Sequence, residues 1–304
     1  MCSNVTKVNQ KYAATVGFFD GVHAGHRFLI EELKKEAKKN GLLSLVITFR
    51  LHPRKVLHDT FQPQLLCSPE EKIQLIESTG VDQVTELDFS PEMAKLSAYD
   101  FMHEILANQL NVSLLLVGHD HRFGRNREDG FTEYEQYGNQ TGIKVIQATY
   151  YITQELNHIS SSEVRKALKT GDIEKANALL TVPYSMTGYV VNGYKVGRKI
   201  GFPTANIQPV HPDKLIPGIG VYAVIVNWHH TSFKAMMNIG QRPTLDNGND
   251  ISLEVHIIDF SEDIYHQRIE IQFIRKIRDE KKFNSVDELI KQLEDDKKFV
   301  MNCC

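Results

Sequence analysis

Long hydrophobic runs, Cys-x-x-Cys pairs and an excess of basic residues are all missing from this 304-residue sequence. No apolar run reaches about 18 residues, the length that a membrane-spanning helix needs. The first 20 residues also lack the basic and apolar regions of a signal peptide. The four cysteines (Cys2, Cys67, Cys303 and Cys304) form no Cys-x-x-Cys pair, so neither a zinc site nor a disulfide framework is expected. We therefore expect a cytoplasmic protein without a membrane partner.

The charge balance argues against a nucleic-acid partner. Lys and Arg number 35 against 38 Asp and Glu, giving a net charge of −3, whereas nucleic-acid binding usually requires a basic domain or stripe. Hydrophobic residues make up 41% of the chain, which is ordinary for a globular protein with a real core. The length favours two domains. Self-association remains open and is not predicted.

The first half of the chain alternates strand-like and helix-like patterns. Apolar strand candidates occupy residues 13–19, 42–49, 81–87, 112–117 and 144–148, and helical periods occupy 27–39, 69–78, 98–109 and 132–137. This alternation predicts parallel βαβ units, that is, a Rossmann-like α/β domain. Ligands of such sheets bind beyond the carboxyl ends of the strands.

The second half reads differently after a helical segment at residues 161–180. Five strand candidates follow, at residues 184–191, 221–228, 233–239, 251–258 and 268–277, with turn residues between them. This pattern predicts an antiparallel sheet or barrel. A last helix is expected from Ser285, which forms a capping box with Glu288. We place the domains at residues 1–182 and 183–304.

Residues 17–26, Gly-Phe-Phe-Asp-Gly-Val-His-Ala-Gly-His, stand where the first strand ends and the first helix begins. His23 and His26 are three residues apart, so both imidazoles lie on one side of the helix start, beside free amides and the positive end of the dipole. Such a place suits phosphate, and the glycines let the backbone approach it. The pattern predicts nucleotidyl transfer, which needs positioning and charge stabilisation. The plainer alternative is that one histidine caps the helix while the other packs.

Two further elements can contribute to this site. A second anion-binding site is expected at another helix start, formed by Ser161, Ser162 and Arg165. The alternative is a plain capping box, since Ser160 and Glu163 have the spacing of one. The loop at residues 117–124 follows a strand and faces the same crevice. Its His119, Asp120 and His121 are a weak signal for a metal site.

The C-terminal half has its own phosphate signature at residues 197–206, Gly-Arg-Lys-Ile-Gly-Phe-Pro-Thr-Ala-Asn. Gly197 and Gly201 permit a backbone cradle for phosphate. Thr204 and Asn206 offer the hard oxygens that Mg²⁺ prefers. Glu254 is the candidate base for an acceptor hydroxyl in phosphoryl transfer, because strand alternation points it the same way as His256. The alternative is an ordinary solvent-facing carboxylate.

These residues resemble the bacterial bifunctional riboflavin kinase/FAD synthetase family. The N-terminal marks are Gly-x-Phe-Asp-Gly-x-His-x-Gly-His (17–26), Val-Gly-x-Asp-x-Arg-Phe-Gly (117–124) and Ile-Ser-Ser-x-x-Val-Arg (159–165). The C-terminal marks are the segment 197–206, Gly-Val-Tyr-Ala (220–223), Asn-Ile-Gly-x-Arg-Pro-Thr (238–244), Leu-Glu-Val-His (253–256) and Ile-Arg-Asp-Glu-Lys-Lys-Phe (277–283).

The resemblance implies an FMN adenylyltransferase followed by a six-stranded riboflavin kinase barrel with a terminal helix. The substrates would be riboflavin, FMN and ATP, with FAD as the final product and Mg²⁺ as the cofactor. The implied catalytic residues are Glu254, His23, His26 and Arg165, and the implied metal ligands are Thr204 and Asn206. Implied ATP or phosphate contacts are Gly17, Phe18, Asp20, Gly25, Ser161, Ser162, Gly197, Arg198 and Gly201; implied flavin contacts are Asp120 and Arg278.

The sequence departs from the family at two places near the first site. Arg50 stands where the family usually has Glu, and His121 where it usually has Phe. One alternative is therefore a riboflavin kinase with a weakened adenylyltransferase site, which FAD formation from FMN would test. A flavin-binding regulator would bind flavin without consuming ATP. A tRNA-linked relative of class I synthetases is disfavoured by the acidic net charge.

Overall fold

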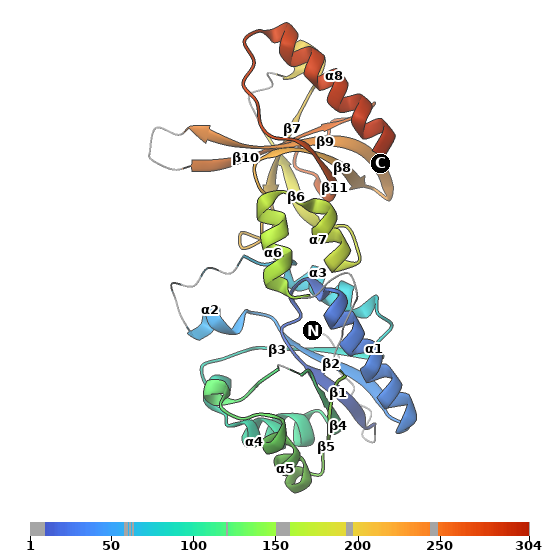
Figure 1. Cartoon of the computed structure of the whole chain (residues 1–304), viewed down its shortest axis with the longest axis vertical. Coiled ribbons are helices and arrows are strands. Elements are labelled where there is room, and N and C mark those ends of the chain that lie inside the picture. The colour runs from blue at the N-terminus through green and yellow to red at the C-terminus, as the bar shows by residue number, and fades with distance from the viewer. Residues whose placement is uncertain are drawn as a thin grey trace. The chain divides into compact units, whose positions relative to one another are not determined.

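The computed structural model describes residues 10–57, 60, 62, 64–119, 121–149, 159–192, 197–243 and 249–303. Internal contacts divide the chain into two compact units, whose elements Figure 1 labels. We call Met1–Pro63 with Ser68–Asn157 the α/β unit, and Gln64–Cys67 with His158–Cys304 the barrel unit. The expected boundary at residue 182 differs from this contact grouping, because the helices of residues 161–180 group with the barrel.

The α/β unit is built on a five-stranded parallel sheet. Its strands are β1 (Tyr12–Val16), β2 (Leu43–Phe49), β3 (Gln83–Leu87), β4 (Val112–Val117) and β5 (Lys144–Gln147), in the order β3-β2-β1-β4-β5. The chain runs outward from β1 to β3 and then returns to the other side of β1. The strand order therefore switches between β1 and β4, and ligands of open parallel sheets bind at such a point.

Helices cover both faces of this sheet. Ile30 and Leu33 of α1 (Ala24–Lys39) and Ile76 of α3 (Pro69–Glu77) pack with Ala13 on one face. The other face is covered by α5 (Phe131–Thr141) and by α4 (Ala98–Asp100), which continues into the π-helical segment η3 (Phe101–Gln109). Shorter elements are η1 (Asp20–Val22), α2 (Pro53–Leu57), η2 (Met93–Lys95) and η4 (Arg125–Arg127).

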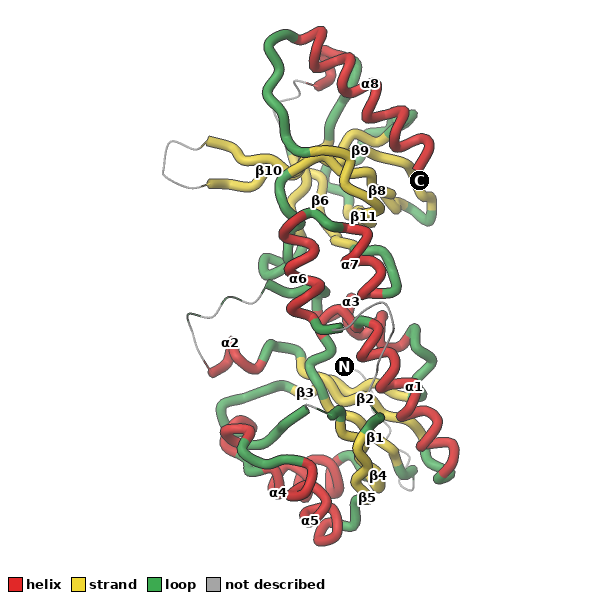
Figure 2. The backbone as a smooth tube through the Cα atoms, in the orientation of Figure 1, coloured by secondary structure: helices red, strands yellow, loops and turns green. Residues whose placement is uncertain are grey.

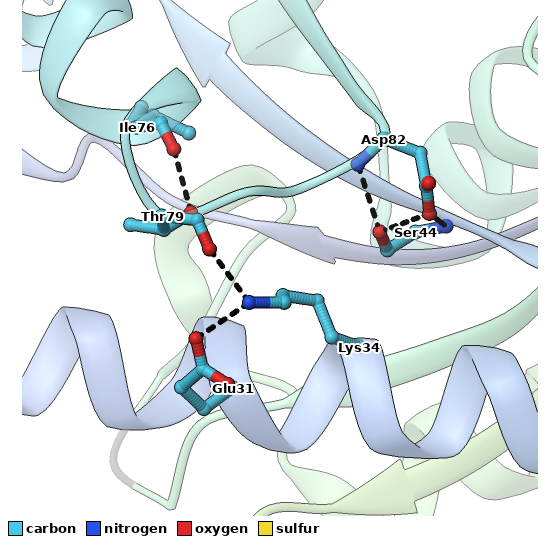
Figure 3. Close-up of polar contacts among 6 residues, drawn as sticks. All are labelled: Glu31, Lys34, Ser44, Ile76, Thr79 and Asp82. Carbon is cyan, nitrogen blue, oxygen red and sulfur yellow. Dashed lines mark hydrogen bonds and ion pairs between the residues drawn. The ribbon is translucent and has the colours of Figure 1, made fainter.

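Polar contacts tie the amino ends of β2 and β3 to α1 (Figure 3). The Asp82 carboxylate accepts hydrogen bonds from the Ser44 hydroxyl at 2.5 Å and from the Ser44 amide at 2.8 Å. These bonds lower the pKa of Asp82. Lys34 of α1 donates to the Thr79 carbonyl and to Glu31, both at 2.6 Å. These hydrogen bonds fix the amino ends of the strands. The predicted site lies at the opposite, carboxyl ends.

The barrel unit closes six antiparallel strands in the order β10-β7-β6-β11-β8-β9. Figure 2 draws these strands in yellow. They are β6 (Ser185–Val191), β7 (Ala205–Pro209), β8 (Gly220–Trp228), β9 (Thr231–Pro243), β10 (Asn249–Ile257) and β11 (Arg268–Arg278). The turn η5 (Gly197–Ile200) precedes β7, and α8 (Val286–Cys303) follows β11. Val300 of α8 packs on Ala223 and Met236 of the barrel.

Two helices precede the barrel in the same unit, α6 (Ser161–Thr170) and α7 (Ile173–Leu180). Asn177 of α7 donates to the Phe273 carbonyl of β11 at 2.9 Å and accepts from the Tyr184 amide at 2.7 Å. The Gly218 amide donates to the Leu168 carbonyl at the end of α6 at 2.9 Å. The Asn177 side chain and a backbone hydrogen bond therefore fix this helix pair to the barrel.

The architecture confirms the predicted fold class, with local differences. Strand β7 was not predicted because it has five residues and follows directly on a turn, which leaves little alternating pattern to detect. Helix α1 begins at Ala24 rather than at residue 27. The Ser285 hydroxyl does accept from the Glu288 amide at 3.2 Å, but the Glu288 carboxylate reaches back to the Asn284 amide instead of that of Ser285.

Candidate active sites

The turn between β1 and α1 places two imidazoles against each other. Gly21 adopts a φ of 78°, which favours glycine, and lets η1 turn the chain into the helix. His23 is the N-cap of α1, and its Nδ1 accepts a hydrogen bond from the His26 amide at 3.4 Å. The two rings stack with centroids 3.7 Å apart and planes at 15°. His23 therefore caps the helix, as the plainer alternative proposed, and both rings also gather on one side, as the spacing predicts.

His26 is kept neutral by its surroundings. Burial, followed by the charges of His23 and His121, holds the pKa of His26 well below 6.5. Its Nδ1 is buried and has no hydrogen-bond partner among the described residues. A buried polar atom without a partner is uncommon in native proteins, and a water molecule or an ion often pairs with such an atom. The head of α1 thus places the neutral His26 ring and the His23 ring beside the first amides of a helix.

A buried lysine stands next to this turn and was not found from the sequence. Lys72 of α3 is 2% exposed, donates to the Phe49 carbonyl at the end of β2 and lies 4.2 Å above the Phe18 ring. Phe18 also meets the edge of the His52 ring at 4.6 Å. The available signal was helical spacing, since Lys72 lies four residues before the buried Ile76 on the apolar face of α3.

The other predicted residues of this site are placed as follows. Gly17 directly follows β1, and its amide donates to the Ile47 carbonyl at 3.0 Å. Asp20 is 4% exposed, and Gly25 lies half-buried in the first turn of α1. Asp120 lies outside the described residues. Arg50, one of the two departures from the family pattern, is exposed.

The second predicted anion-binding site (Ser161, Ser162 and Arg165) belongs to the barrel unit. Ser160 caps α6 by accepting from the Glu163 amide at 3.3 Å, so the capping alternative describes this helix start correctly. Ser161 is half-buried and Ser162 is exposed. The half-buried Arg165 donates from Nε to the Gln64 carbonyl at 2.8 Å, and this contact orients its side chain.

Three of the residues predicted for the second site come together in the barrel. Asn206 of β7 stands directly opposite Glu254 of β10 in the strand register. The Thr204 hydroxyl donates to Glu254 Oε2 at 3.3 Å. Because Asn206 is 9% exposed and Glu254 is half-buried, these oxygens are partly withdrawn from solvent. Electrostatic interactions are stronger in such surroundings than in water.

Thr204 lies at the junction of two cavities. A cavity of about 320 Å³ is lined by Glu254, His256 and Arg278, with apolar walls that include Met236 and Leu293. A second cavity of about 400 Å³ has Val190, Val255 and Ile264 among its lining residues. Thr204 lines both. Thr204 therefore borders two adjacent spaces.

The turn before β7 requires glycine for steric reasons. A Cβ on Gly197 would lie 2.2 Å from the Phe202 carbonyl oxygen, and the Gly197 carbonyl accepts from the Phe202 amide at 3.0 Å. Gly201 has a φ of 85° and is exposed. The backbone of Arg198 belongs to η5, whereas its side chain lies outside the described part of the structure.

Two basic side chains at the 320 Å³ cavity already have partners. Arg278 donates to the Asp296 carboxylate of α8 from Nε at 3.0 Å and from Nη2 at 2.8 Å. His256 Nδ1 lies 2.8 Å from the Pro203 carbonyl oxygen. Burial lowers the pKa of His256, which keeps the ring neutral. Both contacts shape the cavity, since one fixes α8 and the other fixes the turn before Thr204.

Comparison with known proteins matches each half of the chain to a flavin enzyme. The FAD synthetase family model covers residues 5–163, and the riboflavin kinase model covers residues 180–304. The chain belongs to the bifunctional riboflavin kinase/FMN adenylyltransferase family. The family member from Buchnera aphidicola is 36% identical over 296 residues, which is 96% of this chain and 94% of the relative. The member from Bacillus subtilis is 36% identical over 94% of this chain and 90% of the relative.

A solved structure with the same fold carries a different title. A crystal structure from Streptococcus pneumoniae described as a macrolide-efflux protein is 32% identical and covers 97% of this chain and 95% of its own, with a TM-score of 0.87. Within the described part of the present chain, none of the helices has both the length and the apolar character to cross a membrane.

Proposed function

We propose that this member of the family carries out both reactions of flavin cofactor synthesis. The barrel transfers the γ-phosphoryl group of ATP to riboflavin, giving FMN and ADP. The α/β unit then joins FMN to the AMP part of ATP, giving FAD and pyrophosphate. The observation that carries the proposal is the presence in one chain of two separate groups, the His23–His26 stack and the Thr204–Glu254 pair. No observation favours the kinase-only alternative.

For the kinase step we assign riboflavin to the cavity of about 320 Å³ that Glu254 and Thr204 line. The cavity with Met236 and Leu293 suits the apolar ring system of riboflavin, and Glu254 stands at its polar end. Gly197 also lines this cavity, so the ATP phosphates would approach Thr204 from the turn before β7. The acceptor hydroxyl and the γ-phosphate would then meet beside Glu254 and Thr204, where in-line transfer can take place.

Glu254 acts as the base for this step. Its Oε2 takes the proton of the riboflavin 5′-hydroxyl while that oxygen forms a bond to the γ-phosphorus and ADP leaves. Thr204 keeps the carboxylate oriented through its hydrogen bond at 3.3 Å. No residue needs to be covalently modified.

The oxygens around Glu254 fit magnesium. The described residues contain no group of three His, Cys, Asp or Glu that could hold a metal by themselves. The Thr204 hydroxyl and the Asn206 amide oxygen instead suit an ion that takes its remaining ligands from ATP phosphates and water. When bound, Mg²⁺ would neutralise phosphate charge. Gly197, Arg198 and Gly201 would cradle the phosphates.

In the adenylyl step an FMN phosphate oxygen attacks the α-phosphorus of ATP, and pyrophosphate leaves. His23, His26 and the first amides of α1 would stabilise the charge that develops. We assign further ATP contacts to Gly17, Phe18, Asp20, Gly25, Ser161, Ser162 and Arg165, and a flavin contact to Asp120. Arg278 would support flavin binding in the kinase through its hold on α8.

The remaining assignments concern domains and location. We assign adenylyl transfer to residues 1–182 and phosphoryl transfer to residues 183–304. The chain would work in the cytoplasm on riboflavin, FMN and ATP, without a nucleic-acid or membrane partner.

Two feeding experiments test this function. The purified chain is incubated with ATP and Mg²⁺ and either riboflavin or FMN, and flavins are separated by chromatography over time. We expect riboflavin to give FMN and then FAD, and FMN alone to give FAD. If riboflavin is converted to FMN but neither substrate yields FAD, the chain is a riboflavin kinase without adenylyltransferase activity.

A further inference from the structure

A third imidazole, that of His121, lies beside the head of α1. It belongs to the loop that follows β4, the strand next to β1 in the sheet. The His121 amide donates to the Gly118 carbonyl at 3.0 Å, which turns this loop back on itself. A Cβ on Gly118 would lie 3.5 Å from His121 Cβ and 3.8 Å from Leu29 of α1, so the loop lies against that helix. The three imidazoles therefore come from the two strands that flank the switch in strand order.

The nitrogen at the tip of this ring is buried and unpaired. His121 Nε2 has no hydrogen-bond partner among the described residues, and the same holds for His26 Nδ1 and Arg27 Nε. His121 is close enough to His26 for its charge to contribute to lowering the pKa of His26. Three buried donor or acceptor nitrogens thus lack partners around one helix start. Such groups lose free energy unless something pairs with them.

Packing alone does not account for His121. Its ring is tilted at 33° to that of Phe123, with centroids 6.2 Å apart, which is a loose contact that an apolar side chain would make equally well. Burial and then the charge of Arg127 lower the pKa of His121 to about 4. The ring is therefore neutral near pH 7, and a neutral imidazole offers one N–H donor and one acceptor. A neutral donor is well suited to an anion because it needs no counter-charge when the site is empty.

We propose that His121 is a phosphate-binding residue of the adenylyl transfer site, in which Nε2–H donates to a phosphate oxygen of ATP beside His23 and His26. This inference rests on the proposed function of the α/β unit. In this view His121 replaces the apolar ring usual in the family with an additional contact to the nucleotide, and it does not weaken the site.

The test compares three full-length variants in FAD formation from FMN and ATP. His121→Phe removes the donor and keeps an aromatic ring, whereas His121→Gln keeps an N–H donor. His119→Phe changes an exposed histidine of the same loop and serves as the matched control. For each variant, kcat, KM for ATP and KM for FMN are measured, and riboflavin phosphorylation by the same preparation reports on the barrel.

We expect His121→Phe to raise KM for ATP roughly tenfold, as for the loss of one hydrogen bond to a charged group. KM for FMN and the kinase constants should not change. His121→Gln should recover most of the loss, and His119→Phe should match the wild type. An unchanged KM for ATP in His121→Phe would overturn the proposal, and so would a His121→Gln variant as impaired as His121→Phe, because shape alone would then explain the effect.

The wild-type reaction separates this inference from the function on which it rests. If the wild type makes no FAD, the proposed adenylyl transfer fails. ATP binding measured by calorimetry still tests His121 in that case, since the barrel contributes equally in the wild type and in His121→Phe. Identical ATP titrations of the two proteins would refute the assignment of His121.

Discussion

The ion pair between Arg278 and Asp296 holds α8 on the barrel, and Asp296→Asn tests how much it contributes. Asp296 is 2% exposed, while 19% of the Arg278 side chain remains accessible. The carboxylate accepts from Arg278 Nε and Nη2 and from Gln292 Nε2 at 3.0 Å. Asparagine keeps the shape and one acceptor oxygen but removes the charge. The substitution therefore removes the charge and also replaces one of the two accepting oxygens with an NH2 donor.

Removing one partner of a buried ion pair typically costs about 3–5 kcal/mol. The lower end applies here, because Arg278 keeps some solvent and a hydrogen bond to the Asp279 carbonyl at 3.1 Å. A loss of about 3 kcal/mol lowers Tm by roughly 6–12 °C in a cooperative unit of this size. Apolar packing of Val300 should keep α8 near the barrel in the folded state.

Calorimetric unfolding and kinase kinetics measure the effect together. The control is Asp295→Asn, whose carboxylate is 55% exposed and pairs only with Lys298 one turn away among the contacts of the described residues. We expect the barrel transition to fall in Asp296→Asn alone, with a several-fold rise in KM for riboflavin, since Leu289 and Leu293 of α8 line its cavity. Equal Tm values for the two variants would refute this reasoning.

Further predictions concern the two sites. Glu254→Gln should lower FMN formation by roughly 10²–10⁴-fold through loss of the base, while FAD formation from FMN is unchanged; loss of both reactions would contradict separate sites. His26→Ala should do the converse, and a kinase defect in that variant would remove His26 from the adenylyl site. Asn206→Ala should raise the Mg²⁺ concentration that the kinase needs, and an unchanged Mg²⁺ titration would exclude Asn206 as a ligand. The pKa values of His26 and His121 lie below 6.5 in the folded chain, so the unfolded chain binds more protons below that pH. The part of the folding stability that depends on these two histidines is therefore fully present above about pH 6.5. It is lost as the pH falls toward about 4. His121→Phe should flatten this dependence of Tm on pH, whereas a parallel curve would show that His121 does not titrate differently in the folded state.

The parts of each site that are local in sequence could be predicted, because strand ends and helix starts have their own patterns. The spacing of His23 and His26 predicted that their rings lie on the same side of the helix start. Strand alternation predicted that Glu254 and His256 point the same way. Both depend on neighbours within one turn or one strand.

Contacts between distant segments could not be predicted in the same way. Lys72 reaches the Phe49 carbonyl across 23 positions, and Asp296 meets Arg278 across 18. A lysine on an apolar helix face and an aspartate within an acidic run look like surface residues until their partners are known. Strand β7 shows the same limit, because its register opposite β10 places Asn206 at Glu254, and pairing across a sheet is set by the closed barrel.

The chemistry of the two nucleophiles explains why the sites differ. A phosphate monoester such as that of FMN is largely ionised at neutral pH, so its attack requires no base. His26, whose pKa is held well below 6.5, is a poor proton acceptor, and we propose that it contacts the charge that develops on the α-phosphate as a neutral ring. The riboflavin hydroxyl, in contrast, must lose a proton as it attacks, and we propose that Glu254, which accepts a hydrogen bond from Thr204, takes that proton. With these proposed roles, imidazoles stand beside the phosphate where the nucleophile is already ionised, and a carboxylate stands there where the nucleophile must lose a proton.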